Sequence, residues 1–375
     1  MSMGQELITE RVQAVLSSTG LSQRQFAAKL GLDPSQLSRS LHGQRRFTSL
    51  ELARIAEFGE VSVDWLLGLE TPAQAAARVT SSDRSGTAEA VDAASSLVQL
   101  RLDLAEIGAA ETPLTLPVGG ARGSMVEQGM ALAAAALTHA GVTSDAGPLR
   151  DLPGLVESAF GVDVRISPLP TDVDGVAVRS GDAAAIVVAT TRLLPRQRFT
   201  IAHELAHVIC EDDQGLHVDV ASGPHRPDLS EVRANAFAAS LLMPELWLRQ
   251  RTADRDSSDQ QLLDDLVVGL VVSPSALAHR MYNLGLLDER TRDEYVRQSL
   301  RGVLFRSHRF VLHSTWIDEA SRTRVPLRLL ADLWSAYERG DITLRPIAQL
   351  LGRDPEELRA ESEWTGPAPE AYSPA

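Results

Sequence analysis

The chain has 375 residues, a net charge of −14 at pH 7 and a single cysteine. This length predicts two or three domains, each with its own core. One cysteine excludes internal disulfides, and the excess of acidic residues argues against a protein that coats nucleic acid. Residues 1–69 differ, because they hold seven basic and seven acidic residues, and a neutral segment with local arginine clusters can still bind DNA.

The amino-terminal residues carry charges where a signal peptide needs an apolar run, for example Glu6, Glu10 and Arg11. The most apolar stretches, near 183–189 and 262–273, are too short or too interrupted by aspartate to span a bilayer. We therefore expect a soluble, cytoplasmic protein with no membrane partner.

Residues 5–69 predict a small all-helical domain. Ser22 and Asp33 are suited to begin two short helices, and Gly31 is suited to end the first, so the pattern predicts a helix, a tight turn and a second helix. Apolar residues at helical spacing would form the shared core: Phe26, Ala27, Leu30, Leu32, Leu37 and Leu41.

This arrangement resembles the helix-turn-helix domain of the Cro/C1-type (Xre) repressors. The resemblance implies that the second helix enters the major groove of a double-stranded DNA operator, and a homodimer is the geometric expectation for a palindromic operator. The expected DNA-binding residues face bases (Ser35, Gln36 and Arg39) or phosphates (Gln23, Arg45 and Arg46). The alternative is a helical domain used only for protein contacts.

Residues 203–207 read His-Glu-Leu-Ala-His, and the residues from Pro195 onward predict a helix with an apolar face. Residues at i and i+4 lie on one helix face about 5–6 Å apart, so His203 and His207 can bind one zinc ion. Glu204 follows the first ligand, where it can take a proton from an activated water. The spacing therefore predicts metal-dependent hydrolysis. The alternative is a helix whose two histidines bind no metal.

A catalytic zinc ion needs a third protein ligand and an open position for water. Candidates are the acidic residues and histidines that follow the motif: Glu211, Asp212, Asp213, His217, Asp219, His225, Asp228 and Glu231. We favour Glu231, because residues 229–244 predict a second helix on which Glu231 shares a face with small alanines that allow close packing. His217 and His225 fall in an expected loop and stay open as alternatives. Cys210 is interpreted as a small buried residue more than as a ligand.

The run 198–207, together with Glu231 and the motif residues between Ala234 and Pro244, resembles the ImmA/IrrE family of bacterial metallopeptidases. The resemblance implies that His203, His207 and Glu231 bind Zn²⁺ and that Glu204 is the catalytic base. It covers residues 145–290, for which it implies a zincin-like metallopeptidase domain. Within that range the apolar patterning predicts three strands and a turn, at 162–166, 175–178, 184–188 and 180–182.

The remaining segments complete the expected organisation, which is mainly α with a small β-sheet, an α+β class. We expect a flexible linker, a helical connecting segment, a helical carboxyl-terminal domain and a disordered tail, at 70–96, 97–144, 300–362 and 363–375. Residues 260–286 look like a second helix-turn-helix. We interpret them as a packing element of the peptidase domain, with DNA or substrate contact as the alternative.

These features favour a bacterial transcriptional regulator that combines DNA binding with a zinc endopeptidase. The resemblance implies a repressor protein as the substrate, cut to derepress stress or mobile-element genes. That repressor is this chain itself, a paralogue or a co-encoded partner. The alternative is a non-cleaving zinc-containing transcription factor, or an antitoxin, whose peptidase-like domain senses a ligand or partner. Glu204 favours catalysis, because a structural metal site needs no carboxylate beside its ligand.

Overall fold

The structure is a computed structural model that describes a few positions between 8 and 16, then residues 22–59 except residue 43, residue 66, and residues 85–362. Within the last range it leaves out six short stretches: 111–113, 118–122, 144–146, 171–172, 211–216 and 221–228.

In the amino-terminal unit the structure gives the bounds of helices α2 (Gln23–Leu30), α3 (Pro34–Leu41) and α4 (Ser49–Gly59). The Ser22 side chain accepts a hydrogen bond from the Gln25 amide at the start of α2, and Gly31 ends that helix with a φ of 63°. Asp33 caps α3. The apolar faces meet in a core that includes Phe26, Leu37 and Ile55. The predicted helix-turn-helix is confirmed.

A four-stranded sheet lies at the centre of the larger unit, in the order β1 (Val162–Ser167), β3 (Ala183–Ala189), β2 (Val173–Ser180) and β4 (His217–Val220). Strands β1 and β3 are parallel, while β2 is antiparallel to both β3 and β4. The three expected strands are confirmed, but the prediction of a loop around His217 is wrong. Four residues are too few to show a strand period, and pairing with the neighbouring β2 supplies the hydrogen bonds of β4.

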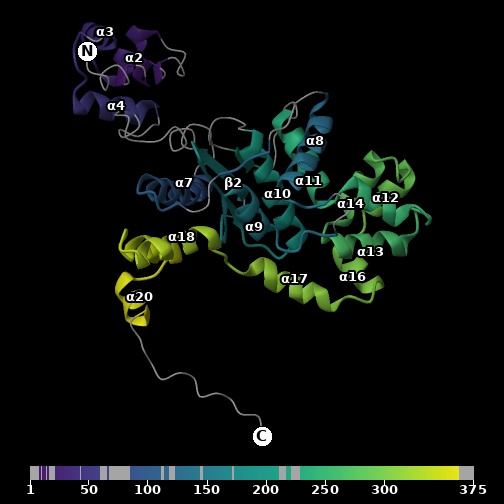
Figure 1. Cartoon of the computed structure of the whole chain (residues 1–375). Helices are drawn as coiled ribbons and strands as arrows, with labels where there is room; N and C mark the ends of the chain where they lie inside the picture. The colour runs from purple at the N-terminus through teal and green to yellow at the C-terminus, as the bar shows by residue number, and fades with distance from the viewer. Residues whose placement is uncertain are drawn as a thin grey trace.

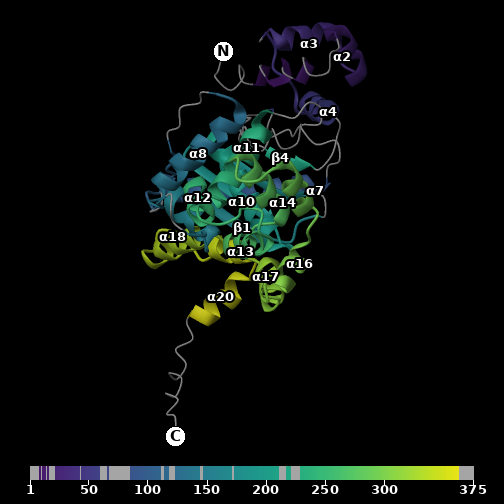
Figure 2. The same cartoon turned by 90° about the vertical axis from the view of Figure 1, so that its right-hand side faces the viewer.

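Helices cover both faces of the sheet, because its side chains alternate between two cores (Figure 1). On one face Val164 and Ile186 pack with α10 (Leu194–Cys210), α11 (Leu229–Leu242) and α8 (Met125–His139). On the other face Val176 and Val187 pack with α7 (Ser85–Glu106). Both views place α8, α10 and α11 side by side (Figures 1 and 2).

Helix α7 extends across the expected boundary between the linker, 70–96, and the connecting segment, 97–144. The predicted flexible linker is wrong for residues 85–96, which form the first half of α7, and residues 70–84 lie outside the described part. Ala90, Val91 and Ala94 are fully buried there, but alanine-rich faces give a weak apolar period. Residues 97–144 do more than connect two domains, since α7 covers the sheet and α8 packs along α11.

The carboxyl-terminal half is also helical. Its helices are α12 (Glu245–Thr252), α13 (Gln260–Leu270), α14 (Pro274–Asn283), α15 (Glu289–Val296), α16 (Leu300–Arg306), α17 (Val311–Ser321), α18 (Leu327–Glu338), α19 (Arg345–Leu351) and α20 (Pro355–Ser362). Before β1 the chain forms α9 (Leu152–Leu155) and a π-helical turn, η1 (Val156–Phe160).

The prediction that residues 300–362 form their own domain is wrong. Val303 and Trp316, from α16 and α17, belong to the core beneath α10, whereas Leu333 and Ile347, from α18 and α19, belong to the core beneath α7. The apolar face of each of these amphipathic helices is buried against one of the two cores that flank the sheet. The expected tail, 363–375, lies outside the described residues.

Helices α13 and α14 match the expected second helix-turn-helix, and the chain bends by 109° between them. Val271 joins them with a φ of 54°, a conformation that is rare for a β-branched residue. The buried side chains of α14, such as Leu277 and Met281, belong to the core beneath α10, as the packing interpretation requires. None of the described helices is long and apolar enough to cross a membrane by itself. Within the described part of the chain, α13 and α14 reach that length and apolar composition only when the bent pair is taken together.

On the α7 side of the sheet, buried ion pairs link helix α7 to strand β1 and to helix α18. Arg101 of α7 donates hydrogen bonds to Asp163 of β1, with Nε 3.0 Å from Oδ2, and to Asp332 of α18. All three residues are buried. Burial raises the pKa of Asp163 to about 6, against the opposing attraction of the Arg101 guanidinium.

Candidate metal centre

The site lies where α10 and α11 pack side by side. His203 and His207 are one helical turn apart on α10, and both are nearly completely buried. Glu231 lies in the first turn of α11 with 30% of its side chain exposed. One ligand atom from each residue can be chosen so that the three lie within 4.8 Å of one another. Among the described residues, this is the group of acidic, histidine or cysteine side chains whose arrangement could hold a metal ion.

The nitrogen and oxygen atoms of this group converge. The two Nε2 atoms are 3.0 Å apart, and they lie 3.2 Å (His203) and 3.3 Å (His207) from the carboxylate oxygens of Glu231. Two imidazoles and a carboxylate form a donor set typical of a divalent metal site. Because Glu231 is partly exposed, solvent reaches one side of the group, as a site that binds water or substrate requires.

Asn235 fixes the orientation of His203. Its Oδ1 lies 3.2 Å from His203 Nδ1 and accepts a hydrogen bond when that nitrogen carries the proton. The Nε2 atom of His203 then keeps its lone pair for a metal. Asn235 is one turn after Glu231 on the same face of α11, so one helix supplies a ligand and supports another. We did not predict this role from the sequence, although the i, i+4 spacing from Glu231 is a usable signal.

Glu204 is completely buried at the interface between α10 and strand β2. A Cβ atom added at Gly175 would lie 3.4 Å from Glu204 Cγ and 2.5 Å from Thr200 Cγ2. Only a glycine therefore allows β2 to approach α10 this closely. Gly175 is a second residue whose role the sequence analysis did not identify, because Glu204 becomes its neighbour only in the folded chain.

The other ligand candidates remain undetermined. The side chains of His217 and Asp219 in β4, and residues 211–216 and 221–228, lie outside the described part of the structure. Cys210 is partly buried and packs against the core, in line with its interpretation as a small apolar residue.

The predicted DNA-binding residues occupy different surroundings. Gln36 and Arg39 are exposed on α3, and Arg46 is exposed after it. The Ser35 hydroxyl donates to Asp33 within the helix cap. Arg45 forms an ion pair with Glu51 of α4. Gln23 is half-buried, and its Nε2 has no hydrogen-bond partner among the described residues.

Comparison with known proteins adds two family matches. Residues 157–282 match the IrrE N-terminal-like domain, and residues 17–66 match a family described as helix-turn-helix. The Radiation response metalloprotease IrrE of Deinococcus radiodurans is 34% identical to the chain over 101 residues. The alignment covers 26% of this chain and 30% of that relative, so the chain spans under a third of the relative's length.

The first family match contains every residue of the metal centre and all four strands of the sheet, and the second contains α2, α3 and α4. At the family level these matches support a DNA-binding regulator with a protease-like domain and a metal ion. The chain thus contains an IrrE N-terminal-like domain at residues 157–282, preceded by a helix-turn-helix domain at residues 17–66.

Proposed function

We propose that this protein is a transcriptional regulator that binds an operator through residues 5–69 and cuts a repressor protein with a zinc-dependent endopeptidase. The observation that carries the proposal is the convergence of His203, His207 and Glu231 beside the buried Glu204. The alternative is a helix whose two histidines bind no metal. That alternative does not explain why a carboxylate from another helix lies close to both Nε2 atoms.

The donor set fits zinc. Ligands about 2.0–2.1 Å from a tetrahedral zinc ion are roughly 3.3 Å from one another. The distances among the three ligand atoms, 3.0, 3.2 and 3.3 Å, are close to that spacing. The hydrogen bond from His203 Nδ1 to Asn235 also matches the support that zinc-bound histidines usually receive.

In the proposed mechanism His203, His207 and Glu231 hold the metal, which when bound supplies Lewis acidity at the scissile carbonyl. Glu204 takes a proton from the attacking water and returns it to the leaving amine. Its burial suits this role, because a carboxylate shielded from bulk water keeps a proton within the site. Asn235 holds the His203 ring in place during the reaction.

The substrate follows from the pairing of domains. A peptidase joined to a DNA-binding module acts where repressors act, so we propose a repressor as substrate: the chain itself, a paralogue or a co-encoded partner. Operator binding by a homodimer and a cytoplasmic location belong to the same proposal. Among the proposed DNA contacts, the exposed residues are Ser35, Gln36, Arg39 and Arg46.

The proposal is tested by comparing the wild-type chain with Glu204→Gln and His203→Ala. Zinc content and cleavage of candidate repressors, including the chain itself, are measured under the same conditions. We expect one zinc ion per chain in wild type and in Glu204→Gln, but cleavage only by wild type. His203→Ala should lose zinc. Equal zinc content without cleavage by either protein would support the non-cleaving sensor instead.

A further inference from the structure

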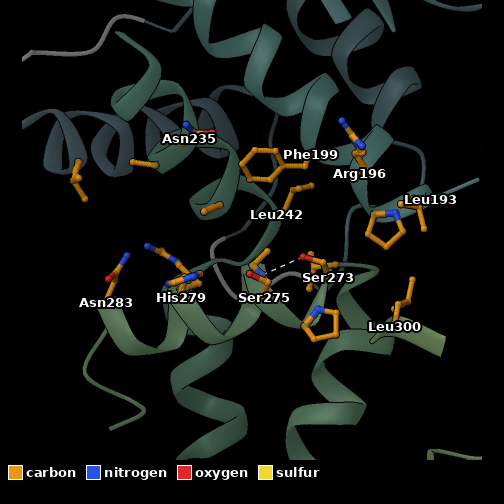
Figure 3. Close-up of a pocket in the computed structure, with 18 of the residues that line it drawn as sticks. Leu193, Arg196, Phe199, Asn235, Leu242, Ser273, Ser275, His279, Asn283 and Leu300 are labelled. Atoms are coloured by element: carbon orange, nitrogen blue, oxygen red, sulfur yellow. Dashed lines mark hydrogen bonds between the residues drawn. The ribbon is translucent and has the colours of Figure 1, made fainter. Parts of the chain in front are cut away.

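A large cavity adjoins the metal centre. It has a volume of about 820 Å³, opens to solvent, and is lined by residues of α8, α10, α11, α14 and α16. Figure 3 shows ten of its lining residues labelled. Two of its lining residues also contact His203: Asn235 through the hydrogen bond to Nδ1, and Phe199 with its ring centroid 6.3 Å from that of the imidazole. A chain that fills this cavity therefore lies against two residues that contact a metal ligand. We call the cavity the apolar pocket.

The walls of the apolar pocket are mostly hydrophobic. Figure 3 shows Phe199 and Leu242 on one side and Leu193 and Leu300 at one end. Leu193 is 49% exposed, although a large aliphatic side chain is usually covered. A cavity of about 150 Å³ already holds a benzene ring, so this volume has room for several bulky side chains. Burial of apolar groups is the favourable term that such walls offer to a ligand.

One arginine in the wall forms no ion pair with the residues that the structure describes. Arg280 of α14 is 5% exposed and lies between the apolar pocket and a second cavity of about 710 Å³. Among the described residues, its guanidinium makes one hydrogen bond, from Nε to the Met243 carbonyl at 3.2 Å, and no ion pair. Burial lowers the pKa of Arg280 to about 10, against the opposing attraction of the Glu245 carboxylate, which forms its own ion pair with Arg249. Arg196, the other arginine of the pocket, is paired with Asp174.

We propose that the apolar pocket binds a stretch of the peptide substrate that carries at least two bulky apolar side chains and one carboxylate, and that Arg280 pairs with this carboxylate. The proposal rests on the proposed endopeptidase function and names its substrate class. A peptide fits better than a free small molecule, because two lining residues of the pocket, Phe199 and Asn235, contact the metal ligand His203. A peptide carboxylate beside Arg280 supplies the ion pair that this guanidinium does not form among the described residues.

The first test uses the zinc-loaded full chain and quenched fluorescent peptides that differ only in the proposed segment: apolar with glutamate, apolar with glutamine, and polar with glutamate. We expect the apolar glutamate peptide to have the highest kcat/KM, at least tenfold above either of the others. Ala239→Trp, which narrows the pocket from α11, should remove the preference for apolar residues while zinc content is retained. The matched control is Ala134→Trp, which places the same side chain in the second cavity.

The role of Arg280 is tested with two substitutions, one that removes its positive charge and one that keeps it. Arg280→Gln should lower the preference for glutamate over glutamine about tenfold, whereas Arg280→Lys should retain most of it. Equal selectivity in wild type, Arg280→Gln and Ala239→Trp would overturn the proposal.

A binding experiment separates this proposal from the endopeptidase itself. Zinc-loaded Glu204→Gln is titrated with the same peptides by calorimetry. In one outcome, wild type cuts no peptide, Glu204→Gln binds the apolar glutamate peptide, and Ala239→Trp in that background abolishes binding. That outcome supports the apolar pocket as a peptide-binding site and contradicts the peptidase function. If decanoate binds and none of the peptides does, the pocket belongs to a small-molecule effector and the substrate proposal is wrong.

Discussion

Gly175 of strand β2 and Glu204 of helix α10 are in direct contact, although 29 positions separate them in the sequence. A Cβ atom at Gly175 would lie 3.4 Å from Glu204 Cγ and 3.5 Å from its Oε1. The glycine thus sets how closely the sheet approaches the helix that carries the proposed base. Since Glu204 has no exposed surface, any movement of β2 reaches its carboxylate.

We predict that Gly175→Ala destabilises the fold by about 1–3 kcal/mol, because the new methyl group overlaps Thr200. It should also lower the rate of cleavage at unchanged zinc content, since Glu204 moves while the metal ligands stay in place. Urea denaturation and metal analysis measure the two effects. The matched control is Gly269→Ala in α13, where a Cβ meets nothing within 4 Å and the helix gains about 0.5–1 kcal/mol. Normal activity and stability in Gly175→Ala would contradict the contact.

Gly129 of α8 gives a second prediction. A Cβ there would overlap the Arg233 carbonyl oxygen of α11, so the added methyl group would force the two helices apart. Alanine normally favours a helix over glycine, but here we expect Gly129→Ala to cost about 1–3 kcal/mol. Because α11 carries Glu231, zinc affinity measured by chelator competition should fall as well. Unchanged affinity and stability would show that α8 does not hold α11 in position.

Local signals explain what the sequence predicts correctly. Ser22 and Asp33 act within a few residues of themselves, so their caps reveal α2 and α3 without knowledge of the fold. The spacing between His203 and His207 is equally local. The choice of Glu231 as third ligand also needs only one helix, because Glu231 shares a face of that helix with small alanines. Strands β1 to β3 are recognisable because their apolar residues either alternate with polar ones or form an unbroken run.

Long-range contacts explain what the sequence does not reveal. Arg101 and Asp332 are 231 positions apart, and nothing near either residue indicates that α7 and α18 share a core. The assignment of residues 300–362 to a separate domain fails for this reason. Strand β4 depends on its neighbour β2 for pairing. The position of Gly175 beside Glu204 is likewise a property of the assembled sheet and helix.

Asn235 offers a test of how His203 is oriented. We predict that Asn235→Ala lowers zinc affinity by roughly 10–100-fold, because the imidazole loses the acceptor that fixes its ring. Asn235→Asp keeps an acceptor at Nδ1 and should retain most of the affinity. Asn283→Ala, at the far side of the apolar pocket, serves as the control in the same chelator competition. Equal losses in Asn235→Ala and Asn283→Ala would contradict a specific role.

The buried aspartate of β1 predicts a dependence of stability on pH. The pKa of Asp163 rises from 3.8 to about 6 in the folded chain, chiefly by burial. Between these values the folded chain binds more protons than the unfolded chain, so the contribution of Asp163 to the free energy of unfolding decreases as pH rises from 4 to 6. A shift of about two units corresponds to roughly 3 kcal/mol.

Asp163→Asn removes this titration, so its stability curve should differ in slope from that of wild type across the same window. Urea denaturation at pH 4, 5, 6 and 7, followed by tryptophan fluorescence, gives the difference between the two proteins. That difference should shift by about 3 kcal/mol in favour of the variant as pH rises, although the variant loses a partner of Arg101 at every pH. Asp174→Asn, in an exposed pair with Arg196, should run parallel to wild type. Parallel curves for Asp163→Asn would mean that Arg101 keeps Asp163 ionised throughout this range.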